Sequence, residues 1–170
     1  APPLVQAACY QLILDRAIGE YRLPDGWSII AAGNREKDKA VSYRMPSALA
    51  NRMVHLEFDA SLDDWLAWAQ GAGIRREVCA FLRFRPRLLH DFYPQRMEKA
   101  FASPRSLEFV SRMLEAAPAR EVEYELFQGT VGPAAAAEFM GFLSVWRELP
   151  AVDSILAQPD AATVPQQPAA

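Results

Sequence analysis

Two short apolar runs interrupt the polar first third of the chain. Residues 28–32 are small or apolar throughout, and residues 54–58 alternate apolar with polar side chains. Runs of this length are typical of strands, although periodicity alone does not separate a buried strand from a buried helix. Residues 18–23 predict a further short extended piece, which ends at the turn Pro24-Asp25-Gly26.

Beyond these runs, apolar residues recur at the three- and four-residue spacing of helices. Asp59 or Ser61 is a suitable N-cap for one helix, and Ser103 followed by Pro104 is a suitable start for another. We expect helices over residues 4–15, 46–52, 62–70, 74–84, 104–114, 120–128 and 133–149.

The fold class predicted by this pattern is mainly α with a small α/β remnant. The break at Gly71-Ala72-Gly73 separates an α/β part, residues 1–70, from a helical part, residues 71–156. Trp65 and Trp68 stand three residues apart on one helical face, which favours a core contact over a base-stacking platform. Residues 157–170 are rich in Ala, Pro and Gln, and we expect disorder because they cannot bury enough apolar surface.

The composition is that of an ordinary globular chain. The 170 residues are 51% hydrophobic and 23% charged, and the formal net charge is −3. This negative balance argues against a general nucleic-acid binder. The sequence has no apolar run long enough to span a bilayer and no signal peptide, so we expect a cytoplasmic location without membrane insertion.

The cysteines and histidines give no support for a metal centre. Cys9 and Cys79 each lie in an apolar helical pattern, and His55 and His90 stand far from both. We therefore expect buried free thiols, with neither a disulfide framework nor a zinc site.

A strip of basic residues makes the middle of the chain locally positive. Such a strip can meet phosphates or an acidic partner. It can equally be the solvated face of the helical part, which we favour because acidic residues interrupt it. Its members are Arg75, Arg76, Arg83, Arg85, Arg87, Arg96 and Lys99.

Three further polar residues occupy positions suited to ligand binding. Asn34 follows the first apolar run and Gly33, where ligands sit in open α/β sheets, but an Asn there is also a common turn residue. Arg52 ends a short helix, where it would interact favourably with the helix dipole. Arg105 lies in the first turn of a helix, which repels cations; a bound phosphate would resolve that conflict, and simple solvent exposure is the alternative.

These pieces, taken in order, resemble the C-terminal portion of an AAA+ ATPase module of the MoxR-like branch. The order is an apolar run, Ala31-Ala32-Gly33-Asn34, a polar loop, residues 45–53, a second apolar run, helices and then residues 102–105. Asn34 matches the sensor 1 asparagine of that family, Arg52 its arginine finger, and Arg105 its sensor 2 arginine. The resemblance covers residues 2–114 and implies an AAA+ P-loop ATPase core followed by a helical lid bundle, with a β-hairpin before the sensor 1 strand.

The nucleotide-binding motifs of the family are absent. A P-loop needs a Gly-Lys pair so that the backbone amides and the Lys surround the phosphates, and this chain contains no Gly-Lys pair. It also lacks an apolar strand that ends in Asp-Glu to hold Mg²⁺. The resemblance implies ATP and Mg²⁺ as cofactors of the intact protein, with neither held tightly by this chain, which should not hydrolyse ATP by itself.

The resemblance also implies partners. The intact protein would assemble into a ring, hydrolyse ATP and remodel a client protein, with Arg52 reaching the nucleotide of the neighbouring subunit. In the sheet of that family, the P-loop strand lies between the sensor 1 strand and the strand that follows the arginine finger. Without the P-loop strand, these two strands would expose unpaired edges, so we expect pairing between copies that gives a dimer. The alternative from another class is a helical protein-interaction module with no role in nucleotide binding, which would use the basic strip, Trp65 and Trp68.

Overall fold

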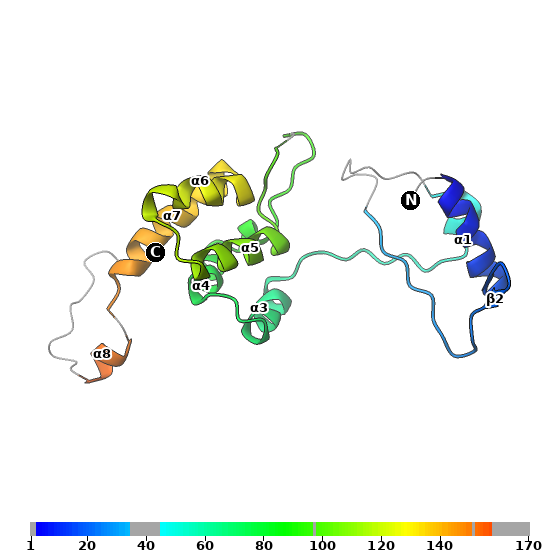
Figure 1. Cartoon of the computed structure of the whole chain (residues 1–170), viewed down its shortest axis with the longest axis horizontal. Helices are drawn as coiled ribbons and strands as arrows, with labels where there is room; N and C mark the ends of the chain where they lie inside the picture. Colours follow the sequence, from blue (N-terminus) through cyan, green and yellow to red (C-terminus); the bar gives the residue numbers. More distant parts are fainter. Residues whose placement is uncertain (1–2, 35–44, 97, 151, 158–170) are drawn as a thin grey trace. The chain divides into compact units, whose positions relative to one another are not determined.

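The computed structural model is mainly helical and divides into two units (Figure 1). It describes residues 3–34, 45–96, 98–150 and 152–157. The first unit is Ala1–Phe58 and the second is Asp59–Ala170. The tail expected to be disordered lies almost wholly outside the described residues, as does the polar loop at residues 35–44.

The first unit pairs one helix with a small hairpin. Helix α1 (Pro3–Asp15) contacts β1 (Ala17–Ile18), which pairs antiparallel with β2 (Tyr21–Arg22). The guanidinium of Arg16 donates to the carbonyl of Trp27 at 2.6 Å and to that of Pro24 at 3.3 Å, so it ties the chain after the hairpin to the end of α1. The extended piece predicted before the Pro24 turn is confirmed as a hairpin.

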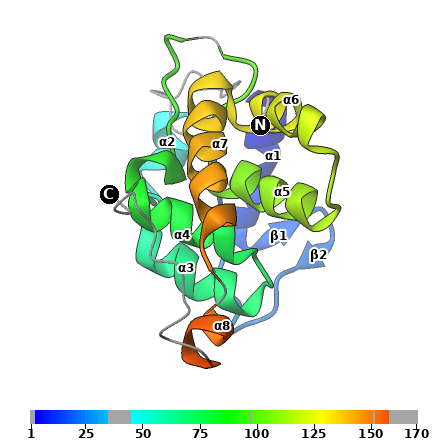
Figure 2. The same ribbon diagram turned by 90° about the vertical axis from the view of Figure 1, so that its left-hand side faces the viewer.

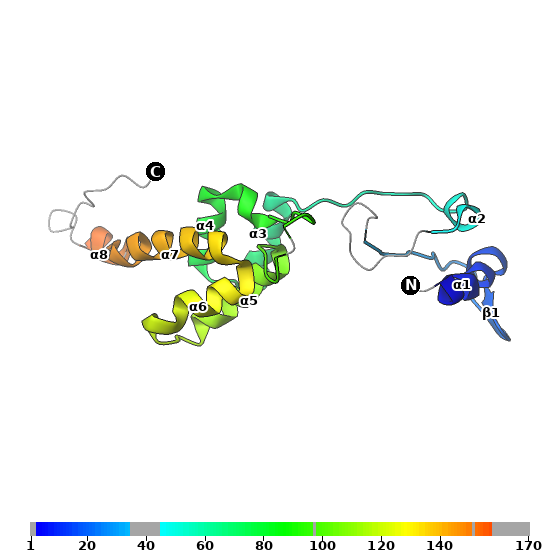
Figure 3. The same ribbon diagram turned by 90° about the horizontal axis from the view of Figure 1, so that it is seen from above.

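The strands predicted at residues 28–32 and 54–58 are not formed. The one sheet among the described residues is the two-stranded hairpin, and the side chain of Ile30 is 91% exposed. Figures 1 and 3 show residues 54–58 as an extended trace outside any sheet. A strand is stabilised by ladder bonds to a neighbouring strand, and neither run has such a neighbour in the part of the chain that the structure describes. The predicted strands were therefore wrong, although the short helix after Pro46 is present as α2 (Ser47–Ala50).

The second unit is a helical bundle (Figure 2), and two of its helices start at serine N-caps. The hydroxyl of Ser61 accepts from the backbone N–H of Asp64, which decides the predicted choice of N-cap in favour of Ser61. Its elements in chain order are α3 (Leu62–Gly71), α4 (Arg76–Phe84), the 3₁₀ helix η2 (Pro86–Leu89), α5 (Pro104–Glu115), α6 (Arg120–Val131), α7 (Pro133–Glu148) and α8 (Val152–Ala157).

Aromatic and aliphatic side chains from several helices form the core of the second unit. The ring of Phe81 on α4 packs edge-on against Phe139 on α7, with ring centroids 4.9 Å apart. Phe127 on α6 contacts the same Phe139 ring at 5.3 Å. Burying each such side chain stabilises the fold by about 1.5–3 kcal/mol. The bundle is therefore held at the meeting point of α4, α6 and α7, and α5 packs against α6.

The division of the chain falls before α3, whereas the sequence placed it after residue 70. Trp65 on α3 is 8% exposed and belongs to the core of the second unit, as its helical spacing predicted. The break at residues 71–73 is present, and Gly73 has a φ of +71°. That break is a turn inside the helical unit, because α3 and α4 pack against each other.

The corner between α6 and α7 depends on a glycine. Gly132 has a φ of +85°, and a Cβ atom built on it would lie 2.8 Å from the carbonyl oxygen of Ala100. The predicted break at residues 129–132 is reduced to this one residue, because α6 continues through Gly129 to Val131. Only glycine satisfies both the backbone angle and the close approach.

Candidate functional site

Arg105 lies at the start of α5, a helix whose first turn is held by two serines. The hydroxyl of Ser103 accepts from the backbone N–H of Ser106 at 3.2 Å, and the hydroxyl of Ser106 accepts from that of Ser103 at 2.8 Å. Ser106 also donates to the carbonyl of Phe101 at 2.9 Å. This reciprocal capping fixes the direction in which the positive end of α5 points.

The side chain of Arg105 is exposed at that positive end. Among the described residues it forms no hydrogen bond or ion pair. Several other arginines of the bundle have carboxylate partners, such as Arg112 two helical turns further along, which pairs with Glu108. Arg105 is thus an exposed cation beside a positive helix end, an arrangement that favours an anionic ligand.

Arg52 contacts its own helix. Its Nη1 donates to the carbonyl of Ala48 at 2.5 Å, and the side chain is exposed. A guanidinium that satisfies a carbonyl at a helix C-terminus is stabilised by that helix. The arrangement matches the helix-dipole interpretation of this residue.

Asn34 is exposed and is the last described residue before the polar loop. No hydrogen bond between Asn34 and Arg52 is present, although both belong to the first unit, whereas Arg105 belongs to the second. The structure therefore does not bring the three predicted residues together within one unit.

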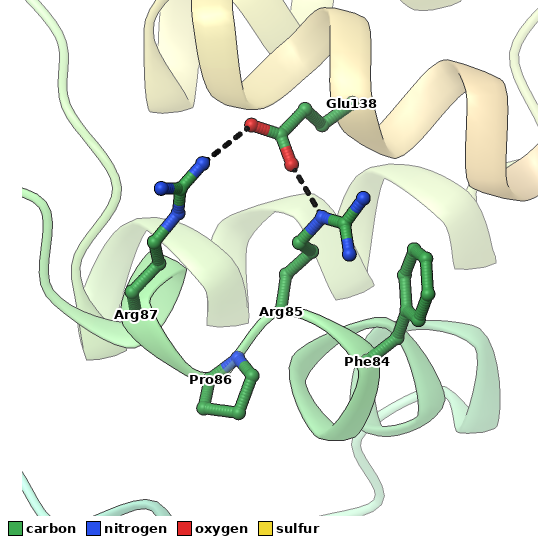
Figure 4. Close-up of a pocket in the computed structure, with 5 residues that line it drawn as sticks. All are labelled: Phe84, Arg85, Pro86, Arg87 and Glu138. Carbon is green, nitrogen blue, oxygen red and sulfur yellow. Dashed lines mark hydrogen bonds and ion pairs between the residues drawn. The ribbon is translucent and has the colours of Figure 1, made fainter. Parts of the chain in front are cut away.

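A hollow in the second unit is lined by charged residues whose pairing was not predicted from the sequence (Figure 4). Arg85 Nε donates to Glu138 Oε2 at 2.8 Å, and Arg87 Nη2 lies 3.4 Å from Glu138 Oε1. The guanidinium of Arg85 also lies over the ring of Phe84, 3.9 Å from its centroid. One carboxylate thus serves two guanidiniums, which leaves a net charge of +1. No local signal linked Glu138 to Arg85, because 53 positions separate them.

The basic strip is partly neutralised. Arg75 pairs with Glu77 at 2.7 Å, and Arg96 pairs with Asp91 at 3.4 Å while its guanidinium lies over the ring of Tyr93. Together with the two arginines on Glu138, four of the seven basic residues have carboxylate partners. This favours the interpretation of the strip as a solvated face over a phosphate-binding surface.

The described part of the fold provides neither a metal-binding cluster nor a reactive cysteine. Among the residues that the structure describes, no three His, Cys, Asp or Glu side chains gather to hold a metal ion. Cys9 and Cys79 are free and half-buried, and burial raises the pKa of the Cys79 thiol. A raised pKa lowers the thiolate fraction at neutral pH, so Cys79 is a poor nucleophile.

Within the described residues, no helix has both the length and the apolar character needed to cross a bilayer. No protein-family model, curated protein or solved structure matches this chain.

Proposed function

We propose that this chain is the part of an AAA+ ATPase module that follows the nucleotide-binding loop, with the bundle as its helical lid. The observation that carries the proposal is Arg105, an exposed arginine without a partner among the described residues, at the serine-capped start of α5. The order of Asn34, Arg52 and Arg105 along the chain supports the same proposal. In this role the chain contributes to nucleotide sensing and depends on a P-loop for binding.

The three residues would act through positioning and charge. ATP with Mg²⁺ supplies the phosphoryl group, and the chain has no Gly-Lys pair with which to hold it. Arg105 fits the phosphate end of a nucleotide because its guanidinium and the N-terminus of α5 are both electropositive. Arg52 would have to leave the carbonyl of Ala48 to reach a nucleotide on a neighbouring subunit. Asn34 would offer an amide to a water or phosphate oxygen.

Calorimetry with ATP tests this proposal. We expect no binding by the present chain, and a Kd on the order of micromolar for a chain extended upstream to include a P-loop. In the extended chain, Arg105→Ala should weaken binding about ten-fold or more, because a hydrogen bond to a charged group contributes about 1.5–3 kcal/mol. Arg120→Ala is the matched control, since Arg120 is also an exposed arginine in the first turn of a helix.

The second candidate function is a protein-interaction module without a nucleotide role. The observation that favours it is the exposure of large apolar side chains at Val54, Leu56 and Phe58 and of Trp68. If the extended chain ignores ATP, or if Arg120→Ala weakens binding as much as Arg105→Ala, the ATPase proposal fails. The interaction module is then the better account of the chain.

A further inference from the structure

The hollow beside the ion pair of Arg85 and Glu138 has the size of a pocket for a small molecule. Its volume is about 640 Å³, and ligand pockets typically have volumes of about 300–1,000 Å³. Such pockets combine an apolar lining with a few polar groups. This hollow has both, since it is lined by Phe84, Arg85, Pro86, Arg87 and Glu138.

The guanidinium of Arg85 is held in its orientation by two contacts. Its Nε donates to Glu138 Oε2 at 2.8 Å, and its centre lies 3.9 Å from the centroid of the Phe84 ring. The Phe84 ring in turn stacks with Phe142 of α7, with the two centroids 6.2 Å apart, so it is a supported surface. Because these contacts order the Arg85 side chain in advance, a ligand that binds it loses less conformational entropy.

The same contacts direct the terminal nitrogens of Arg85 to one side. The hydrogen bond with Glu138 uses Nε and takes up neither Nη1 nor Nη2. Figure 4 shows these two nitrogens on the Phe84 side of the ion pair, away from Arg87. The Arg85 side chain is 40% exposed, which gives a ligand access to it. A pair of terminal guanidinium nitrogens matches the two oxygens of a carboxylate in a fork that lysine does not provide.

The charge of the hollow suits a ligand with a single negative charge. Two guanidiniums and the carboxylate of Glu138 leave a net charge of +1, which one carboxylate would balance. A phosphate group carries about −1.5 to −2 at neutral pH, so it would leave an excess of negative charge beside Glu138. Arg87 is 77% exposed and contacts Glu138 at 3.4 Å, so its main contribution to binding is its charge.

We propose that this hollow binds a small organic carboxylate. The two terminal nitrogens of Arg85 hold the carboxylate oxygens, and the rings of Phe84 and Pro86 contact the apolar part of the ligand. Glu138 is a positioning residue, because it orients Arg85 and does not itself attract an anion. The inference concerns a different site from Arg105 and does not depend on the proposed nucleotide role.

Titration with sodium benzoate, followed by NMR chemical shifts of the backbone amides and the arginine Nε–H groups, tests the proposal on the unchanged chain. We expect saturable shifts at Arg85 and its neighbours with a Kd on the order of millimolar, as is typical of a ligand of this size. Benzamide has the same shape without the charge, and it should bind about ten-fold more weakly or not at all. Inorganic phosphate should also bind about ten-fold more weakly, because of its larger charge beside Glu138. Absence of saturable benzoate binding, or equal binding of benzamide or phosphate, would overturn the proposal.

Two variants test the role of the Arg85 fork. Arg85→Lys keeps the positive charge and should weaken benzoate binding about ten-fold, because an ammonium group does not form the paired hydrogen bonds. Arg83→Ala is the matched control, since Arg83 is an exposed arginine of the same helix that does not line the hollow. If Arg83→Ala weakens binding as much as Arg85→Lys, benzoate is attracted by the general positive charge and the proposed site is wrong. Circular dichroism confirms that both variants keep their helices, and the comparison of benzoate with benzamide does not depend on either variant.

Discussion

Arg147 on α7 forms two hydrogen bonds with the carboxylate of Glu123 on α6, one of 2.8 Å from Nη1 and one of 2.6 Å from Nη2. The residue Glu123 is 3% exposed, so the ion pair lies in the helix interface rather than on the surface. The hydrogen bond with Glu123 raises the pKa of Arg147 further above its ordinary value. This pair joins the two helices that follow each other across the Gly132 corner.

Removing the arginine of this pair should destabilise the second unit. We expect Arg147→Met to lower the free energy of unfolding by about 3 kcal/mol, because it leaves the Glu123 carboxylate buried without its partner. Urea unfolding monitored by circular dichroism measures the change. The double variant E123L/R147M should recover most of the loss, since two packed apolar side chains leave no charge buried.

Arg112→Met provides the control for that experiment. The Arg112 side chain is 69% exposed and pairs with Glu108 along one helix, so its removal should cost under about 1 kcal/mol. If Arg147→Met costs no more than Arg112→Met, then the Glu123 carboxylate is solvated and the interface does not depend on the pair.

Gly132→Ala should destabilise the second unit by about 2–3 kcal/mol. The new Cβ would meet the carbonyl of Ala100 at 2.8 Å, and the φ of +85° is strained for any residue with a Cβ. Thermal unfolding measures the loss. Gly129→Ala is the matched control: Gly129 lies inside α6 with open space around it, so alanine should stabilise by about 0.5–1 kcal/mol. Equal effects of the two variants would contradict the close approach at Gly132.

Glu77 should make the second unit sensitive to acid. Burial raises the pKa of this carboxyl, but the hydrogen bond from Arg75, a backbone hydrogen bond and the charges of Arg75 and Arg147 together bring it below its ordinary value. A lowered pKa in the folded state stabilises the protein at neutral pH. That contribution is lost as the pH falls below about 4.3, the value of an unperturbed glutamate.

Urea unfolding at a series of pH values measures this effect. Glu77→Gln should flatten the acid limb of the stability profile and lower stability at neutral pH. Arg75→Met should flatten the same limb, because it removes the hydrogen bond that favours the charged form. An acid limb that is unchanged in both variants would show that other carboxylates set it.

The helices were predictable because their signals are local. Ser61 and Ser103 mark helix starts, the apolar spacing of α5 and α7 follows one face, and the mainly helical fold class is confirmed. The strands predicted at residues 28–32 and 54–58 are not formed, and this outcome could not be read from the runs themselves, because a strand depends on a partner that lies elsewhere in the sequence. An apolar run indicates that burial of the segment is favourable, but it does not indicate which other segment would cover it.

In the candidate site, too, the features with local signals could be predicted from the sequence, and the contacts between distant residues could not. The position of Arg105 in the first turn of α5 could be predicted from Ser103 and Pro104 alone. The contact of Arg52 with Ala48 could be predicted as one of two alternatives from its place at a helix end. The pairing of Glu138 with Arg85 could not, because it depends on how α7 packs against α4.

The core of the helical unit draws every one of its buried members from residues 65–143. Its closest helix pairs, α5 with α6 and α6 with α7, are neighbours along the chain. Packing of this kind has low contact order, and chains of low contact order fold in microseconds to milliseconds. The bundle should therefore reach its native state quickly and without help from the first 58 residues, which would make it a self-sufficient folding unit and a natural segment for exchange between proteins.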